Sequence, residues 1–191
     1  GVESYRNSYG VDIASGGGST VRGGLVYDNA NMGIRLSGNS SSSIARVESS
    51  TVYGNSTGIS LGAYSTAEGN VVYDNQTGLY ATGAGSTLIN NRIYANTQYG
   101  IHATAIPGGQ ITGNTVYANP VGVYITNSGS NPLVSNNLIY ANASYGLVLN
   151  AISTAQILNN TLYQTMGDAL LLQGSSTGVS LRNNIFWVDA G

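Results

Sequence analysis

The stretch Asn114-Thr115-Val116-Tyr117-Ala118-Asn119, followed shortly by Gly122-Val123-Tyr124-Ile125, is one copy of a pattern that returns along the whole chain. The pattern reads Asn, any residue, aliphatic, aromatic, any residue, Asn, a short gap, and then Gly, aliphatic, any residue, aliphatic. Its aromatic position recurs every 20 to 26 residues, at Tyr5, Tyr27, Tyr53, Tyr73, Tyr94, Tyr117, Tyr140, Tyr163 and Trp187. A self-similar period of this length indicates a solenoid, in which each repeat stacks on its neighbours.

Four positions of the aligned repeat are almost wholly aliphatic, and the positions between them are polar or mixed. In the copy around Tyr117 they are Ile111, Val116, Val123 and Ile125. Each repeat therefore holds three short segments in which buried and exposed residues alternate, which is the pattern of β-strands and not of a helix. We predict an all-β parallel β-helix of about eight turns, with 20–26 residues and three short strands per turn, and turns about 4.8 Å apart.

Two asparagine columns and one glycine column accompany the strands. Asparagine tolerates the left-handed backbone of a tight corner, and its amide can donate to one turn while accepting from another. We therefore predict two structural ladders, and we do not interpret these residues as a binding site because they recur in every turn. One ladder contains Asn70, Asn91, Asn114, Asn137 and Asn160. The other contains Asn29, Asn55, Asn75, Asn96, Asn119 and Asn142, with Thr165 and Asp189 next in its column. The glycines should mark a corner with positive φ or a close backbone approach, at Gly10, Gly33, Gly58, Gly78, Gly100, Gly122 and Gly146.

These repeats resemble those of the right-handed parallel β-helix repeat family, the pectate-lyase-like solenoids whose turns read NNxIYxNxxxGIxL. The copies that carry the resemblance are Asn90-Asn91-Arg92-Ile93-Tyr94-Ala95-Asn96 with Gly100-Ile101-His102-Ala103, and Asn136-Asn137-Leu138-Ile139-Tyr140-Ala141-Asn142 with Gly146-Leu147-Val148-Leu149. The resemblance covers essentially all 191 residues and implies a right-handed coil that forms one domain over residues 1–191. The family includes pectin and alginate lyases, polygalacturonase-like hydrolases, epimerases, phage tailspikes and bacterial surface proteins, so several functions stay open.

The amino-acid composition reduces the number of possible functions. Only 7% of the residues are charged, the net charge is −2, and all six cationic residues are arginines, so nucleic acid is not an expected partner. No apolar run is long enough to span a membrane, and the absence of cysteine excludes disulfides and thiolate chemistry. Ser, Thr, Asn, Gly and Tyr are abundant, as is typical of exported bacterial proteins. We expect a secreted or cell-surface bacterial protein without a cofactor.

One outward column offers a candidate binding face. Tyr80, His102 and Tyr124 occupy the position between the two aliphatic residues after the glycine, so they should lie on three successive turns. The family resemblance implies that this strand faces the substrate groove. A row of rings can stack against sugars, and His102, the only histidine, titrates near neutral pH. Together with Arg35 from the same column, these residues are candidates for a lyase site, in which His102, Tyr80 and Tyr124 supply base and acid and Arg35 neutralises a carboxylate. The other interpretation is a cross-strand stack that only stabilises the sheet.

A second outward column contains Arg22, Glu48 and Glu68, and Arg46 stands two residues before Glu48. Two carboxylates on adjacent turns are suitable for acid–base chemistry or for a divalent cation. They also fit an ordinary surface ion-pair ladder.

Motifs that the resemblance would imply for catalysis are absent. The chain has neither the Asp-Asp and Gly-His-Gly elements of polygalacturonases nor the Asp-Pro-His-Asp-type motif of alginate epimerases. The sequence therefore favours a noncatalytic structural or adhesive β-helix. The alternative is a polysaccharide lyase or epimerase-like module, or a glycan-binding module, that uses the Tyr80–His102–Tyr124 face.

Both ends of the chain stop within a repeat, without the polar cap that solenoids usually carry. Uncapped parallel strands recruit further strands. We therefore expect that the chain is part of a longer β-helix, or that copies stack head to tail into filaments.

Overall fold

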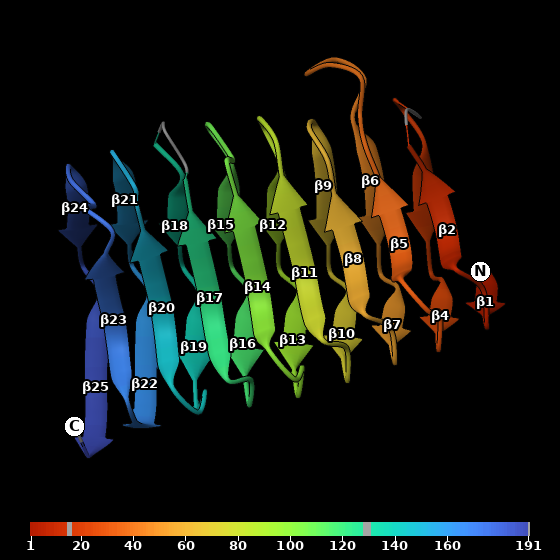
Figure 1. Cartoon of the computed structure of the whole chain (residues 1–191). Coiled ribbons are helices and arrows are strands. Elements are labelled where there is room, and N and C mark those ends of the chain that lie inside the picture. Colours follow the sequence, from red (N-terminus) through yellow and green to blue (C-terminus); the bar gives the residue numbers. More distant parts are fainter. Residues whose placement is uncertain (15–16, 128–130, 191) are drawn as a thin grey trace.

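The computed structural model describes residues 1–14, 17–127 and 131–190, and these contain strands β1 to β25. Every strand pairs in parallel with the strand that occupies the same position in the next turn, so the chain coils through three sheets. Figure 1 shows the turns side by side from β1 to β25. This architecture confirms the predicted all-β parallel β-helix of about eight turns. Among the described residues, no helix is long and apolar enough to cross a membrane.

The three sheets are named here A, B and C. Sheet A consists of β1 (Glu3–Tyr5), β4 (Leu25–Tyr27), β7 (Thr51–Tyr53), β10 (Val71–Tyr73), β13 (Arg92–Tyr94), β16 (Thr115–Tyr117), β19 (Leu138–Tyr140), β22 (Thr161–Met166) and β25 (Ile185–Ala190). Sheet B consists of β2 (Tyr9–Ile13), β5 (Met32–Leu36), β8 (Thr57–Leu61), β11 (Thr77–Thr82), β14 (Tyr99–Thr104), β17 (Val121–Thr126), β20 (Tyr145–Asn150) and β23 (Asp168–Gln173). Sheet C consists of β3 (Thr20–Arg22), β6 (Ala45–Glu48), β9 (Ser65–Glu68), β12 (Thr87–Ile89), β15 (Gln110–Thr112), β18 (Leu133–Ser135), β21 (Ala155–Leu158) and β24 (Val179–Arg182).

The core is the interior of the coil, and the four predicted aliphatic columns fill it. Ile111, Val116, Val123 and Ile125 of one turn are all fully buried. Their counterparts in the neighbouring turns lie directly above and below them, since the strands pair in register. Burial of each such side chain stabilises the fold by about 1.5–3 kcal/mol. The coil therefore needs no covering layer on its outer faces.

Two buried asparagine ladders close the corners, as predicted. In the first, the backbone N–H and the Nδ2 group of Asn96 both donate to Oδ1 of Asn119, at 3.0 Å each. Asn119 repeats the same two bonds to Oδ1 of Asn142, at 3.1 Å each. The second ladder has the same geometry, with Asn91 donating to Oδ1 of Asn114. The ladder asparagines are 0–5% exposed from Asn29 to Asn160, so these bonds satisfy amides that water does not reach.

The backbone strain of the corner does not lie on the ladder asparagines, which corrects the sequence interpretation. The residue immediately before each ladder position takes the left-handed conformation instead. Before Asn119 it is Ala118, with φ of 54°, and before Asn91 it is Asn90, with φ of 54°. The ladder residue itself keeps an ordinary φ because its side chain must point inward, toward the next turn.

The glycine column marks a close approach and not a positive φ. A Cβ atom on Gly100 would lie 2.7 Å from the carbonyl oxygen of Gly122 and 2.8 Å from Nδ2 of Asn119. The corresponding glycines of the other turns meet the same obstacles, and their φ values are not left-handed. Here the absence of a side chain makes room for the ladder amide.

Residue Gln164 ends the first ladder, whereas the sequence alignment places Thr165 in that column. Oε1 of Gln164 accepts from the N–H of Asn142 at 2.8 Å. On the next strand Gln164 pairs with Val188, which has no side-chain amide to accept a hydrogen bond. Nε2 of Gln164 is therefore buried without a hydrogen-bond partner. In the other turns the ladder residue stands two positions after the aromatic residue. Gln164 stands only one position after Tyr163, so a fixed spacing from the aromatic residue does not find it.

The ladder gives a direct test of the fold. Replacement of Asn119 by Leu removes the acceptor of the Asn96 backbone N–H and of one Nδ2 hydrogen, while Nδ2 keeps its bond to the Tyr94 carbonyl. Each buried N–H left unsatisfied costs about 1–3 kcal/mol. We expect Asn119→Leu to lower the midpoint of urea unfolding markedly. Gln98→Leu, at an exposed position in the turn of Asn96, is the control and should leave the midpoint nearly unchanged. Equal midpoints for the two variants would show that the asparagine ladder does not contribute to stability.

Candidate functional site

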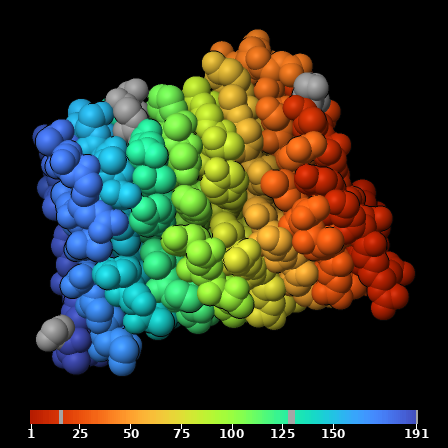
Figure 2. Space-filling view, viewed as in Figure 1, coloured from red at the N-terminus to blue at the C-terminus, as the bar shows by residue number. Residues whose placement is uncertain are grey.

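Tyr80, His102 and Tyr124 lie on the outer face of sheet B, on the adjacent strands β11, β14 and β17. Tyr80 pairs with His102, and His102 pairs with Tyr124, so the three side chains occupy three successive turns, as predicted. All three are half-buried. Figure 2 views the molecule from this side, and successive turns form neighbouring bands across the face.

The rings of this column are not parallel to one another. The His102 ring is turned edge-on to Tyr80, with centroids 5.2 Å apart and planes at 64°, and edge-on to Tyr124, at 5.3 Å and 69°. A fourth ring, Tyr99, packs against both His102 and Tyr124, at 4.9 and 5.4 Å. We call these four residues the His102 cluster. Sequence analysis missed Tyr99, although it stands next to Gly100 at the start of the same strand.

The environment of His102 keeps its ring neutral. Its Nε2 atom lies 3.2 Å from Oγ1 of Thr104, and partial burial lowers the pKa of the ring below its ordinary value of 6.5. The hydroxyl oxygen of Tyr124 accepts a hydrogen bond from Nδ2 of Asn150 at 2.8 Å. The hydroxyl proton of Tyr124 is not used in this bond and can be donated to another group. The cluster therefore offers hydroxyl donors, a neutral imidazole and aromatic edges.

Arg35 lies on the same face but not in the cluster. It is on β5, and strands β8 and β11 separate it from His102 on β14. Its Nε donates to Oδ1 of Asp12 at 2.8 Å, and Nη2 forms an ion pair with the same carboxylate. With turns about 4.8 Å apart, Arg35 is roughly 14 Å from His102 along the coil axis. The four lyase candidates are thus not assembled into one site.

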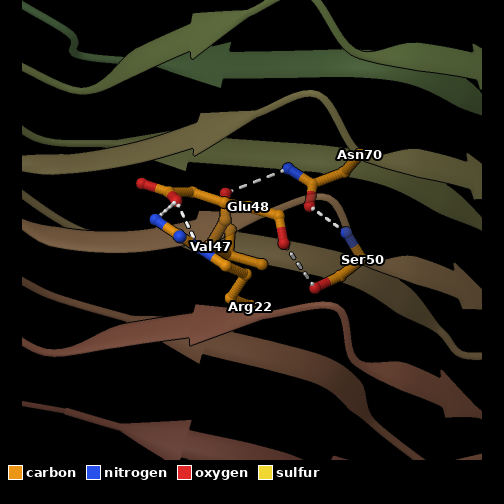
Figure 3. Close-up of polar contacts among 5 residues, drawn as sticks. All are labelled: Arg22, Val47, Glu48, Ser50 and Asn70. Carbon is orange, nitrogen blue, oxygen red and sulfur yellow. Dashed lines mark hydrogen bonds and ion pairs between the residues drawn. The ribbon is translucent and has the colours of Figure 1, made fainter. Parts of the chain in front are cut away.

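Glu48 and Glu68 pair on adjacent strands of sheet C, and a shallow depression of about 300 Å³ lies beside them. Figure 3 shows the guanidinium of Arg22 against the Glu48 carboxylate, with Nη2 2.6 Å and Nε 3.0 Å from Oε2. Nearby, Asn70 donates to the Val47 carbonyl and belongs to the ladder. The contact between Arg22 and Glu48 fits the interpretation as a surface ion pair, since Arg22 is largely exposed.

In the described part of the chain, the two glutamates are not grouped with a third metal-ligating residue. Within the described parts of the chain, no three His, Cys, Asp or Glu residues are grouped so that they could hold a metal ion. Calcium takes about six to eight oxygen ligands, more than these two carboxylates supply, and the Glu48 carboxylate is already bound to Arg22.

A long tyrosine stack on sheet A was not recognised as a surface feature from the sequence. The seven aromatic residues from Tyr5 to Tyr140 stack face to face on the outside, with centroids 4.9–5.1 Å apart and planes within 5–11°. The stack ends after Tyr140, because Tyr163 pairs edge-on with Trp187 at 73°. The repeat itself contained the signal, since parallel strands in register place identical outward residues on top of one another.

The lowered pKa of His102 predicts a pH dependence of stability. Well above pH 6.5 the histidine is neutral in both the folded and the unfolded chain. As the pH falls through 6.5, the unfolded chain binds the proton more readily, because the folded chain has the lower pKa. Stability should therefore fall as the pH drops from about 7 to 5. His102→Gln should reduce this loss, as measured by urea unfolding at several pH values. The carboxylates are the same in the unchanged protein and in His102→Gln, so their contribution to the pH dependence cancels when the two curves are compared. Parallel pH curves for the two proteins would mean that His102 is fully solvated.

Comparison with protein families gives two matches. The model of the right-handed β-helix region matches residues 61–190, and the model of the periplasmic copper-binding protein NosD matches residues 1–111. The residues present do not fit copper. The chain has no cysteine, and its one histidine and two methionines, Met32 and Met166, lie on the separate strands β14, β5 and β22. We therefore assign no metal chemistry. No curated sequence is similar enough to this chain to count as a match.

Several solved structures share the fold. The periplasmic alginate epimerase AlgG is 20% identical, with a TM-score of 0.84, over 96% of this chain and 48% of its own. The A-module of the Azotobacter vinelandii mannuronan C-5 epimerase AlgE4 is 18% identical, with a TM-score of 0.81, over 100% and 59%. The pectate lyase Pel9A is 15% identical, with a TM-score of 0.72, over 92% and 58%.

The chain thus spans about half the length of these proteins, and the likeness shows the fold alone. Family models, strand topology and buried ladders agree on one assignment. The chain belongs to the right-handed β-helix family, and its N-terminal part also fits the NosD family model.

Proposed function

We propose that this β-helix binds a polysaccharide on the outer face of sheet B, at the His102 cluster. The observation that carries the proposal is the grouping of four polar-edged rings on β11, β14 and β17, all half-buried and within 5.4 Å of a neighbour. Elsewhere on this face the same column holds Ser60 and Val148, so the rings are not a requirement of the fold.

The chemistry of the cluster favours binding over turnover. A uronate lyase needs a base, an acid and a cation that neutralises the carboxylate next to the reacting carbon. His102 is neutral and able to accept a proton, but strands β8 to β20 carry no charged side chain on the outer face of sheet B. Arg35, the nearest cation in the same column, is held by Asp12. Saccharide hydroxyls and apolar sugar faces match the neutral cluster better.

The comparisons support a carbohydrate ligand over the purely structural or adhesive role that the sequence favoured. The similar structures include two epimerases that are named for alginate and mannuronan and a lyase named for pectate. Two of the matches are described as periplasmic, and on this basis we propose an extracytoplasmic location in a bacterium.

A lyase or epimerase-like activity is the second candidate, favoured by the same neighbours and by the neutral His102 ring. It has a simple test. Incubation with alginate, mannuronan and polygalacturonate should give no rise in ultraviolet absorbance from unsaturated products, and no change in uronate composition by NMR. Product formation that disappears in His102→Ala would replace binding by catalysis as the function of this face.

Head-to-tail assembly stays a prediction, and the sheet topology makes it harder. Sheet A has nine strands, whereas sheets B and C have eight each. A second copy that places its β1 on β25 would leave sheets B and C about one turn, roughly 4.8 Å, short of contact. Inward-facing Leu181 and Phe186 remain 45% and 42% exposed in the last turn. Sedimentation at increasing concentration distinguishes a monomer from open-ended filaments.

Glycan binding at the His102 cluster is tested by affinity measurements on a panel of neutral and acidic polysaccharides. Loss of one ring contact costs about 0.5–1.5 kcal/mol, so Tyr124→Ala and Tyr99→Ala should each weaken binding by about three- to tenfold. The control Tyr27→Ala removes a half-exposed ring from sheet A and should bind like the unchanged protein. Binding to no glycan, or equal loss in all three variants, would refute the proposal.

A further inference from the structure

A second surface of the coil has a different chemistry. On the outer face of sheet A, strands β13, β16 and β19 present two columns side by side, which we call the Arg92 strip. It consists of Arg92, Tyr94, Thr115, Tyr117, Leu138 and Tyr140. The strip contains a cation and a run of stacked phenols, and these three strands carry no carboxylate.

Arg92 is fixed in place by the tyrosines and not by an acid. Its Nε and Nη2 atoms donate to the hydroxyl of Tyr117, at 2.9 and 2.6 Å. Its guanidinium carbon lies 5.1 Å from the ring centroid of Tyr94 and 5.6 Å from that of Tyr117. The ion pairs of the described residues are Arg22–Glu48 and Arg35–Asp12, so no carboxylate there neutralises Arg92. Its remaining N–H groups face solvent, because the side chain is exposed.

The stacked phenols exclude ligands that bind by ring stacking. Tyr94, Tyr117 and Tyr140 cover one another's faces, with centroids 5.0 and 4.9 Å apart and planes within 7° and 11°. What remains accessible is a row of ring edges and hydroxyl groups, repeated once per turn. Between Tyr94 and Tyr140 a nucleobase or another flat aromatic ligand finds no open ring face, whereas a polymer rich in hydroxyl groups finds a donor or acceptor at each step.

The partner must also be anionic and extended. A preorganised, uncompensated guanidinium favours a carboxylate, which it binds with charge-assisted hydrogen bonds. The hydroxyls repeat along the coil axis at the spacing of the turns, so a linear chain that lies parallel to the axis meets them in sequence. We propose that the Arg92 strip binds an extended carboxylated polysaccharide along sheet A, with Arg92 recognising a sugar carboxylate and the tyrosine hydroxyls recognising neighbouring sugar hydroxyls.

This site is separate from the His102 cluster. The cluster lies on strands of sheet B and carries no cation, whereas the strip lies on sheet A and depends on one. The two surfaces therefore differ in ligand charge and in salt sensitivity. The inference does not rest on the function proposed for the cluster, and each can fail alone.

The experiment compares polygalacturonate with its fully methyl-esterified form, which keeps the backbone and removes the negative charges. The dissociation constant is measured by calorimetry at two salt concentrations. The acid form should bind in a salt-sensitive manner, and Arg92→Gln should weaken it by about tenfold or more, because the variant loses the charge-assisted hydrogen bonds to the sugar carboxylate. Arg92→Lys should also weaken it, because lysine lacks the planar fork. Arg46→Gln on sheet C is the charge-matched control and should bind normally.

Four outcomes would overturn the inference. One is equal affinity of Arg92→Gln and the unchanged protein for polygalacturonate. Another is equal affinity of the unchanged protein for the acid and the ester. The third is displacement of polygalacturonate by single-stranded DNA at equal charge concentration. Arg92-dependent binding that persists in His102→Ala supports the strip, and its complete loss in that variant would assign all binding to sheet B. Thermal unfolding of each variant checks that the fold is intact.

Discussion

The buried side-chain amides of this coil depend on acceptors that the next turn supplies. Oδ1 of each ladder asparagine accepts both the backbone N–H and the Nδ2 group of the asparagine one turn before. Without that partner every corner would bury two unsatisfied donors, at about 1–3 kcal/mol each. This requirement fixes the register of neighbouring turns, and the register in turn aligns the aliphatic columns inside and the tyrosine stack outside. Gln164 shows the limit of the ladder, because its Nε2 remains unpaired where Val188 follows.

The same constraint distributes strain and space within a turn. The ladder residue must point inward, so the sharp bend falls on the residue before it, such as Ala118 or Asn90. Left-handed backbone costs a non-glycine residue roughly 1–2 kcal/mol, and the ladder bonds offset that cost. On the next strand, Gly100 leaves room for the amide of Asn119. The asparagines and the glycine of each repeat therefore depend on one another, because the geometry of one makes room for the hydrogen bonds of the next.

The two candidate surfaces differ from the rest of the coil mainly at positions that the repeat leaves free, although the Arg92 strip also uses the repeat's own tyrosines. The column of His102 contains Ser60 and Val148 in other turns, and the column of Arg92 contains Thr115 and Leu138. These substitutions leave the coil unchanged, since the side chains point away from the core. A neutral aromatic cluster on sheet B and a cationic phenol strip on sheet A thus lie on one scaffold, and these are the two surfaces for which we propose polysaccharide binding.

The sequence by itself determined the parallel β-helix, its turns, its aliphatic core and the two ladders, because a period of 20 to 26 residues repeats each physical requirement many times. It also placed Tyr80, His102 and Tyr124 on successive turns. It did not determine ring orientation, the contact of Tyr99 with His102, or the separation of Arg35 from the cluster. Nor did it show that Arg92 rests on Tyr94 and Tyr117. Those features depend on side-chain rotamers and on partners from different turns, which are set by packing in three dimensions and not by a repeating pattern.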